Sequence, residues 1–257
     1  MGTTRDDEKA AAKLARKEKR SETADRNRLA FEEFLLRQSP AALTEKLLAL
    51  AGQSREAVRD LNFWMKSESG DAGKLKSLVF EGLRAPAFIR RVGCRAYAGQ
   101  VARVLALLRM RMAKGDYLAC AGAAQAALKK LFKVAENCED SDGVVGDRIR
   151  EMRDLHVEAL GQLDLNRKAL GRTVFELRFK DPWGIVELMH YEATLGYEGL
   201  AEYGAILEKT WAAPPKETAL SDPYYVDIET AKRMRLDSMM VRWRESKGEL
   251  AGLINAV

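Results

Sequence analysis

The chain has 257 residues, with 43 lysines and arginines against 38 aspartates and glutamates, which gives a formal net charge of +5. Its apolar fraction of 47% is too high for a disordered chain, and three cysteines are too few for a disulfide scaffold. The longest apolar runs, such as residues 104–108, are far shorter than the ~20 residues that a membrane span needs. The chain starts with early acids and no apolar stretch, so we expect no secretory signal, no membrane association and a cytoplasmic location.

Helix-forming residues dominate the sequence, which has only six prolines and no sustained alternating run of β-branched residues. We therefore predict an all-α fold. Residues 1–38 are expected to form an extended basic helical arm, because residues 9–20 carry six basic side chains and one acid. This arm has little to bury before the apolar residues between Leu29 and Leu36, which form a face that can dock on a core.

A helical core is predicted over residues 39–213. Ser39 and Pro40 are typical of a helix start, and Gly52 is typical of a helix end. Further helices are expected between short polar breaks: residues 54–68, 75–83, 86–114, 117–137, 144–163, 166–180, and 183–212 with a break near Gly196. Because short connections favour antiparallel neighbours, we expect an antiparallel helical stack, either superhelical and TPR-like or an irregular bundle.

Residues 214–257 are predicted to form the last part of the chain. The prolines between Pro214 and Pro223 indicate a linker. A final helix is expected over residues 228–256.

Residues 84–114, which include the predicted helix at residues 86–114, carry eight basic side chains and no acid. On one continuous helix, four of them fall within about 40° of one another: Arg84, Arg91, Arg95 and Arg109. Arginine makes paired hydrogen bonds to carboxylates and phosphates, so this arginine ridge is a candidate anion- or partner-binding surface. The alternative is a solvated face that the acids of residues 136–158 neutralise.

The N-terminal arm offers a second basic surface. Four of its residues are candidates for contact with a nucleic-acid backbone or an acidic partner: Lys13, Arg16, Lys17 and Arg20. Phosphate neutralisation would make such binding strongly dependent on salt. The alternative is a tail that serves solubility, and its apolar surface is too small to anchor in a bilayer.

The acidic turn Asp140-Ser141-Asp142-Gly143 invites comparison with a calcium-binding loop. However, Cys138 and Ile149 stand where an EF-hand needs oxygen ligands. We therefore expect a structural role, in which Ser141 or Asp142 caps the next helix and the glycine relieves the turn.

The remaining chemistry-bearing residues follow no known motif. His156 and His190 have no partner at metal-ligand spacing. Cys94, Cys120 and Cys138 lack a pattern that lowers a thiol pKa, so we expect them to pack. The sequence contains no Walker loop, nucleophile elbow or dinucleotide-binding glycine turn. We predict no metal site, no cofactor and no catalytic residue.

Segments in the middle of the chain resemble an all-helical bacterial domain family of unknown function, which in some proteins occurs beside SWIM-type zinc-finger segments. The similar segments are residues 47–51, Phe88-Ile89, residues 140–147, and residues 169–176 with Leu195-Gly196 and Gly199-Leu200. The resemblance covers about residues 40–212 and implies a helical-repeat fold and no known reaction. The chain departs from the family at Pro182-Trp183, and it has no SWIM-type pattern of cysteines and histidines. A zinc function therefore does not carry over.

These observations favour a non-enzymatic helical scaffold that binds another macromolecule, above all a protein. Several aromatic residues either line a groove or belong to the core, and we favour the core for Trp211: Trp183, Tyr191, Trp211, Tyr224 and Tyr225. The alternative is a nucleic-acid-associated protein that uses the arm and the arginine ridge, and the third hypothesis is an enzyme with an unrecognised site. The oligomeric state is left open.

Overall fold

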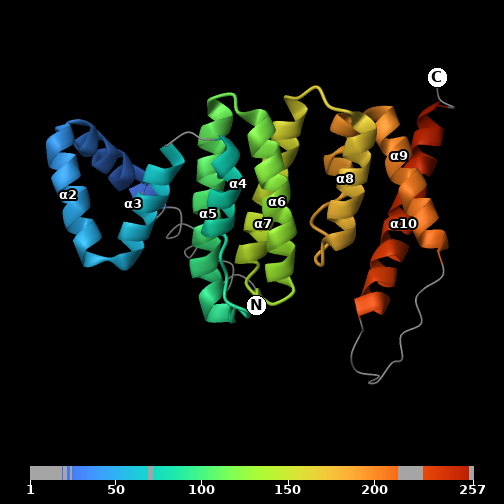
Figure 1. The fold of residues 1–257 in the computed structure, drawn as a ribbon, viewed down its shortest axis with the longest axis horizontal. Helices are drawn as coiled ribbons and strands as arrows, with labels where there is room; N and C mark the ends of the chain where they lie inside the picture. The colour runs from blue at the N-terminus through green and yellow to red at the C-terminus, as the bar shows by residue number, and fades with distance from the viewer. Residues whose placement is uncertain (1–18, 20–21, 24, 69–71, 214–227, 255–257) are drawn as a thin grey trace, which may run out of the picture. The chain divides into compact units, whose positions relative to one another are not determined.

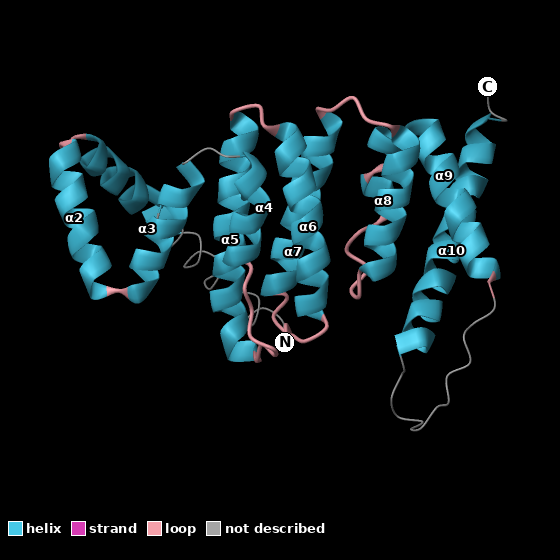
Figure 2. Cartoon of the chain, in the orientation of Figure 1, coloured by secondary structure: helices cyan, strands magenta, loops and turns pink. Residues whose placement is uncertain are grey.

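A computed structural model describes residues 19, 22–23, 25–68, 72–213 and 228–254. These residues are predominantly helical (Figure 2), and their only β pairing is an isolated parallel bridge between Ile89 and Cys138. The all-α prediction is therefore confirmed for the described part of the chain. Two compact units are present, residues 1–65 and 66–257, which we call the N-terminal and C-terminal units. The predicted division at residues 38 and 213 stays a prediction.

Among its described residues, the N-terminal unit contains a helical segment over residues 25–36, then α2 (Pro40–Gln53) and most of α3 (Arg55–Glu68). Two serine side chains satisfy N–H groups at the helix starts. The Ser39 hydroxyl accepts a hydrogen bond from the Ala42 N–H, and the Ser54 hydroxyl accepts one from the Ala57 N–H. The predicted helix start at Ser39 is thus confirmed.

The C-terminal unit continues with α4 (Ala72–Gly82), α5 (Arg91–Ala113), α6 (Tyr117–Ala135), α7 (Val144–Gly161), α8 (Arg167–Lys180), the 3-10 turn η1 (Leu188–His190), α9 (Glu192–Ala212) and α10 (Ile228–Ile254). Figure 1 shows α5, α6, α7 and α8 joined at alternating ends, so consecutive helices run antiparallel as predicted. Helices α4 to α7 pack together, and α8 to α10 form a second group. The two groups meet where α6 contacts α8 and α7 contacts α9. A superhelical, TPR-like arrangement stays a prediction. None of the described helices has the length and apolarity that crossing a bilayer requires.

The core of the C-terminal unit combines small and large apolar side chains. On α6, Ala123, Ala124 and Ala127 are completely buried, which lets neighbouring helices approach closely. Leu128 and Leu131 of the same helix are also completely buried. Each such leucine contributes about 1.5–3 kcal/mol through the removal of apolar surface from water.

Helix α5 begins later than the sequence predicts. The helix expected over residues 86–114 starts only at Arg91, because the preceding segment is held in an extended conformation. The Ile89 N–H donates to the Asn137 carbonyl and the Glu139 N–H donates to the Ile89 carbonyl, both at 2.9 Å. These two hydrogen bonds to a distant part of the chain replace the first helical turn.

The predicted break near Gly196 is confirmed within α9. Gly196 has φ +55° and ψ −172°, a left-handed backbone conformation that kinks the helix and that glycine adopts without a Cβ clash. The predicted linker at residues 214–223 lies outside the described residues.

Helices α8 and α9 cross with their backbones almost in contact. A Cβ atom added to Gly171 of α8 would collide with the carbonyl oxygen of Gly199 on α9. A Cβ atom added to Gly199 would lie 2.8 Å from the Arg167 carbonyl oxygen. Only glycine at both positions allows this separation between the two helices.

Candidate binding surfaces

The arginine ridge differs from its sequence-based form. Arg84 lies in the loop after α4 and not on α5, so its predicted alignment with the other three arginines is wrong. The reason is the late start of α5. Arg91 is the first residue of this helix, Arg95 follows one turn later, and Arg109 lies near its other end.

Acids of residues 136–158 contact two of the three ridge arginines that lie on α5. The Arg91 guanidinium lies 2.7 Å from the Asp142 carboxylate, and the Arg109 guanidinium lies 3.5 Å from that of Glu151. The hydrogen bond from Arg91 lowers the pKa of Asp142, and the charge of Arg95 lowers it further. An incoming phosphate would therefore compete with carboxylates that are already in place.

The four candidate residues of the N-terminal arm lie outside the described residues: Lys13, Arg16, Lys17 and Arg20. Their predicted role stays a prediction.

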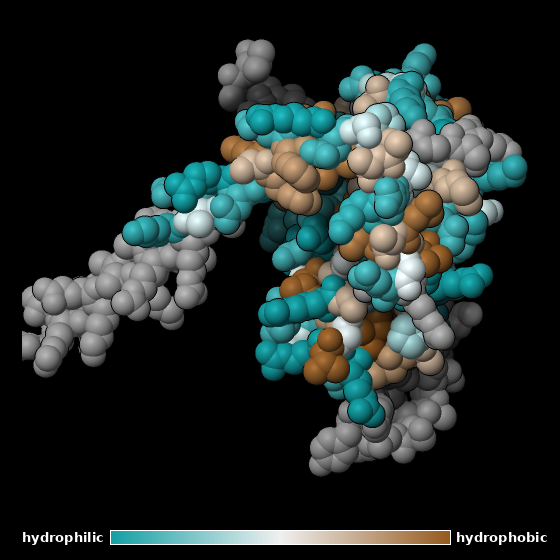
Figure 3. All heavy atoms as spheres, turned by 90° about the vertical axis from the view of Figure 1, so that its left-hand side faces the viewer, coloured by the Kyte–Doolittle hydropathy of each residue, from teal (hydrophilic) through white to brown (hydrophobic). Residues whose placement is uncertain are grey.

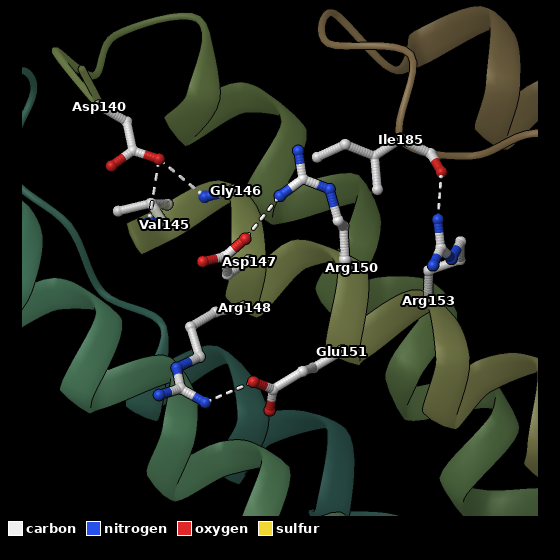
Figure 4. A network of polar contacts seen from close by, with 9 residues as sticks. All are labelled: Asp140, Val145, Gly146, Asp147, Arg148, Arg150, Glu151, Arg153 and Ile185. Atoms are coloured by element: carbon white, nitrogen blue, oxygen red, sulfur yellow. Dashed lines mark hydrogen bonds and ion pairs between the residues drawn. The ribbon is translucent and has the colours of Figure 1, made fainter. Parts of the chain in front are cut away.

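Asp140 caps the start of α7. Its Oδ2 accepts hydrogen bonds from the N–H groups of Val145, at 2.9 Å, and Gly146, at 2.7 Å (Figure 4). Its Oδ1 is buried and has no hydrogen-bond partner. The carboxylate therefore satisfies two backbone donors that the helix itself leaves unpaired.

The predicted cap by Ser141 or Asp142 is wrong, although the expected structural turn is present. Gly143 has φ +72°, which reverses the chain and brings the earlier Asp140 back over the helix start. Asp142 binds Arg91 instead.

The exposed face of α7 carries its own compensating charges. Arg150 lies 2.6 Å from Asp147, and Arg148 lies 2.5 Å from Glu151, which also contacts Arg109 (Figure 4). Acidic and basic groups thus alternate here, and the described surface of α5 and α7 is a mosaic of charges.

His156 belongs to the core. The residue is 1% exposed, and its Nδ1 lies 3.0 Å from the Tyr191 hydroxyl. Burial lowers the pKa of His156 to about 4, so the ring is neutral at pH 7. In the described residues no three His, Cys, Asp or Glu side chains gather where they would hold a metal ion.

The aromatic residues considered for a groove are scattered. Tyr191 is completely buried, so of the two alternatives considered for it the core is confirmed. Trp183 is exposed, and Trp211 is half-buried with its indole N–H donating to Asp237. Tyr224 and Tyr225 lie outside the described residues.

Cys94 and Cys138 lie together in the structure. Their sulfur atoms are 3.5 Å apart, a proximity that their separation in the sequence concealed. Burial, together with the neighbouring Cys94, raises the pKa of Cys138 to about 12. Burial also raises the pKa of Cys120 to about 11. Cys120 and Cys138 are therefore protonated thiols at pH 7, which makes them poor nucleophiles.

The N-terminal unit exposes many large apolar side chains, and no residue of α2 is buried. Leu36 is 80% exposed and Phe31 is 62% exposed. Figure 3 views the molecule from the α2 side and shows hydrophobic residues at the surface between hydrophilic ones. We call the following residues the apolar surface of the N-terminal unit: Leu29, Phe31, Phe34, Leu36, Leu47, Leu48, Leu50, Val58, Trp64 and Met65.

The sequence pattern does not predict this surface. It predicts that the apolar residues between Leu29 and Leu36 dock on a core and that those of α2 and α3 belong to a helical core, whereas many of these side chains are exposed. Exposed side chains of this kind, when concentrated in one part of a protein, mark sites of interaction with other proteins.

No protein-family model, curated protein or solved structure matches the chain. The resemblance to a bacterial helical family therefore stays a prediction, and the function rests on the surfaces described above.

Proposed function

We propose that the chain is a non-enzymatic helical scaffold that binds another protein through the apolar surface of the N-terminal unit. The observation that carries this proposal is the exposure of large apolar side chains on three successive helical segments. Covering one such side chain contributes up to about 1.5–3 kcal/mol. A partner that covers several of them therefore gains enough free energy for a stable complex, after the cost of association is met.

The charges of residues 25–65, which form the described helices of this unit, favour a protein over a nucleic acid. Residues 25–65 contain six acidic and six basic side chains, so the segment offers no net charge to a phosphate backbone. An apolar helical surface suits a partner that presents an apolar helix face of its own. The arginine ridge supports the nucleic-acid alternative only weakly, because Arg91 and Arg109 already contact carboxylates.

Site-specific photo-crosslinking tests the proposal. A photoreactive amino acid replaces Leu48, which is 66% exposed on α2, in the full chain inside the cells that naturally produce it. The matched control carries the same group at Val92, which is 92% exposed on α5. We expect a discrete adduct with a second protein from position 48 that position 92 does not give.

A substitution in the same surface sharpens this test. With the crosslinker at position 48, Leu47→Asp places a charge beside it and should abolish the adduct, because burying an unpaired carboxylate is costly. The proposal fails if both positions give the same adducts, if position 48 gives none, or if its adducts are with nucleic acid or with the chain itself.

A further inference from the structure

A cavity of about 460 Å³ lies in the C-terminal unit, between the end of α8, η1, α9 and α10. This volume is within the range of sites that bind small molecules. Part of its wall is apolar and includes Leu188, Met239 and Trp243, all three of them buried residues.

Two polar side chains with unused hydrogen-bonding capacity line this cavity. Arg178 is 8% exposed and Tyr203 is 1% exposed. No hydrogen bond or ion pair joins the guanidinium of Arg178 or the hydroxyl of Tyr203 to another described residue, and their polar atoms are open to solvent in the cavity. The two groups are close enough for the positive charge of Arg178 to lower the pKa of Tyr203, against the larger effect of burial.

Comparison with the other buried arginine shows that this situation is unusual within the molecule. Arg153 is 9% exposed, but it donates a hydrogen bond to the Ile185 carbonyl at 2.8 Å and pairs with Asp154 at 2.7 Å. A buried cation normally has such partners, because removing it from water without them is costly. Arg178 lacks them, and it lines an open cavity.

The carboxylates around the cavity do not serve as ion-pair partners of Arg178. Glu187 forms an ion pair with Arg242, which is the main cause of the lowered pKa of Glu187, and Arg178 adds only a weaker attraction. Glu192 and Glu245 also line the cavity but are exposed residues, so water solvates them. A positive charge in the buried part of the cavity is thus left for an anion from outside.

We propose that this cavity binds a small molecule that carries one carboxylate on an apolar, aromatic-sized body. The carboxylate accepts hydrogen bonds from the Arg178 guanidinium and the Tyr203 hydroxyl, and the body packs against Trp243 and Met239. Charge-assisted bonds supply the selectivity for the anion, and the apolar wall supplies burial. None of these residues belongs to the N-terminal unit, so this proposal does not depend on the protein-binding function.

Calorimetric titration of the full chain with a matched pair of probes tests the inference. The probes are 3-phenylpropanoate and its neutral amide, which have the same body and differ in charge. We expect the acid to bind at least about tenfold more tightly than the amide, the difference that a hydrogen bond to a charged group makes. Equal affinities, or no binding of the acid at millimolar concentration, would overturn the proposal.

Variants then assign the binding to the cavity. Arg178→Met removes the charge at similar length and should lower the affinity for the acid to that for the amide. Arg172→Met is the matched control, an exposed arginine on the same helix, and should leave both affinities unchanged. If Arg178→Met does not fold, Tyr203→Phe removes only the hydroxyl and should still weaken acid binding. An unchanged acid affinity in whichever of the two variants is folded, or an equal loss in the control, contradicts the assignment.

Discussion

Inside the C-terminal unit, a buried hydrogen bond links His156 of α7 to Tyr191, the residue just before α9. Burial is the first cause of the shifted pKa of each side chain, and for Tyr191 it outweighs the positive charge of Arg153, which acts to lower the pKa. The histidine is consequently neutral where an exposed histidine would titrate. Its role is structural, and it makes stability depend on pH.

The histidine predicts a specific pH dependence of unfolding. In the unfolded chain His156 takes up a proton near pH 6.5, whereas in the folded chain it does so only near pH 4. The stabilisation that comes from the neutral His156 is therefore complete above pH 6.5. As the pH falls toward 4, its loss lowers the free energy of unfolding by about 3 kcal/mol. Urea unfolding at several pH values should show a smaller loss for His156→Gln than for the unchanged chain. His190→Gln serves as the control, and the same pH dependence in His156→Gln and the unchanged chain would contradict the prediction.

At the scale of single elements, helix ends and helix crossings carry specific requirements. The Asp140 carboxylate is the cap of α7, and the glycine pair Gly171 and Gly199 sets the separation of α8 and α9. Both features are contacts between groups that local sequence patterns do not join.

The cap predicts the effect of removing one carboxylate. Asp140→Ala leaves the N–H groups of Val145 and Gly146 without their acceptor and should lower the free energy of unfolding by about 1–2 kcal/mol. Asp140→Asn retains one acceptor oxygen and should lose less. Urea denaturation measures both values, and an equal loss in the two variants would show that the cap is not the cause.

The helix crossing predicts opposite effects for one type of substitution. Gly171→Ala forces α8 and α9 apart and should lower the free energy of unfolding by about 1–3 kcal/mol. Gly99→Ala, within α5 and with open space around the new methyl group, should raise it by about 0.5–1 kcal/mol. Both are measured by urea denaturation. A gain of the same size in both variants would mean that helix propensity, and not the crossing, governs the response.

The sequence predicted elements well where their cause is local. Ser39 with Pro40 marks a helix start that depends on neighbouring residues only, and Gly196 marks a kink for the same reason. The predicted start of α5 was wrong because the backbone of Ile89 forms hydrogen bonds with residues almost fifty positions further along the chain. The apolar surface was missed, since an amphipathic helix has the same sequence pattern whether its apolar face meets its own core or solvent.

At the scale of the whole molecule, the two units differ in how they bury apolar residues. The buried apolar residues of the described chain begin at Leu75, so that core lies within the C-terminal unit. The N-terminal unit has exposed apolar side chains instead. The proposed protein-binding surface is therefore separate from the buried core that stabilises the fold.

This division predicts that the C-terminal unit folds alone. A variant that starts at Ala72 retains α4 to α10 and should have the same urea midpoint as the full chain, within the small loss of the exposed ion pair between Lys66 and Glu81. It should also bind less of the dye ANS, because the apolar surface has been removed. A much lower midpoint, or unchanged dye binding, would contradict the division.

The crossing of α8 and α9 also constrains how the protein evolves. Lysines and arginines on the outside can be exchanged during divergence at little cost, whereas Gly171 and Gly199 have no substitute that preserves the distance between their helices. Remote homologues of this fold should therefore be recognised by that glycine pair more reliably than by their pattern of charges.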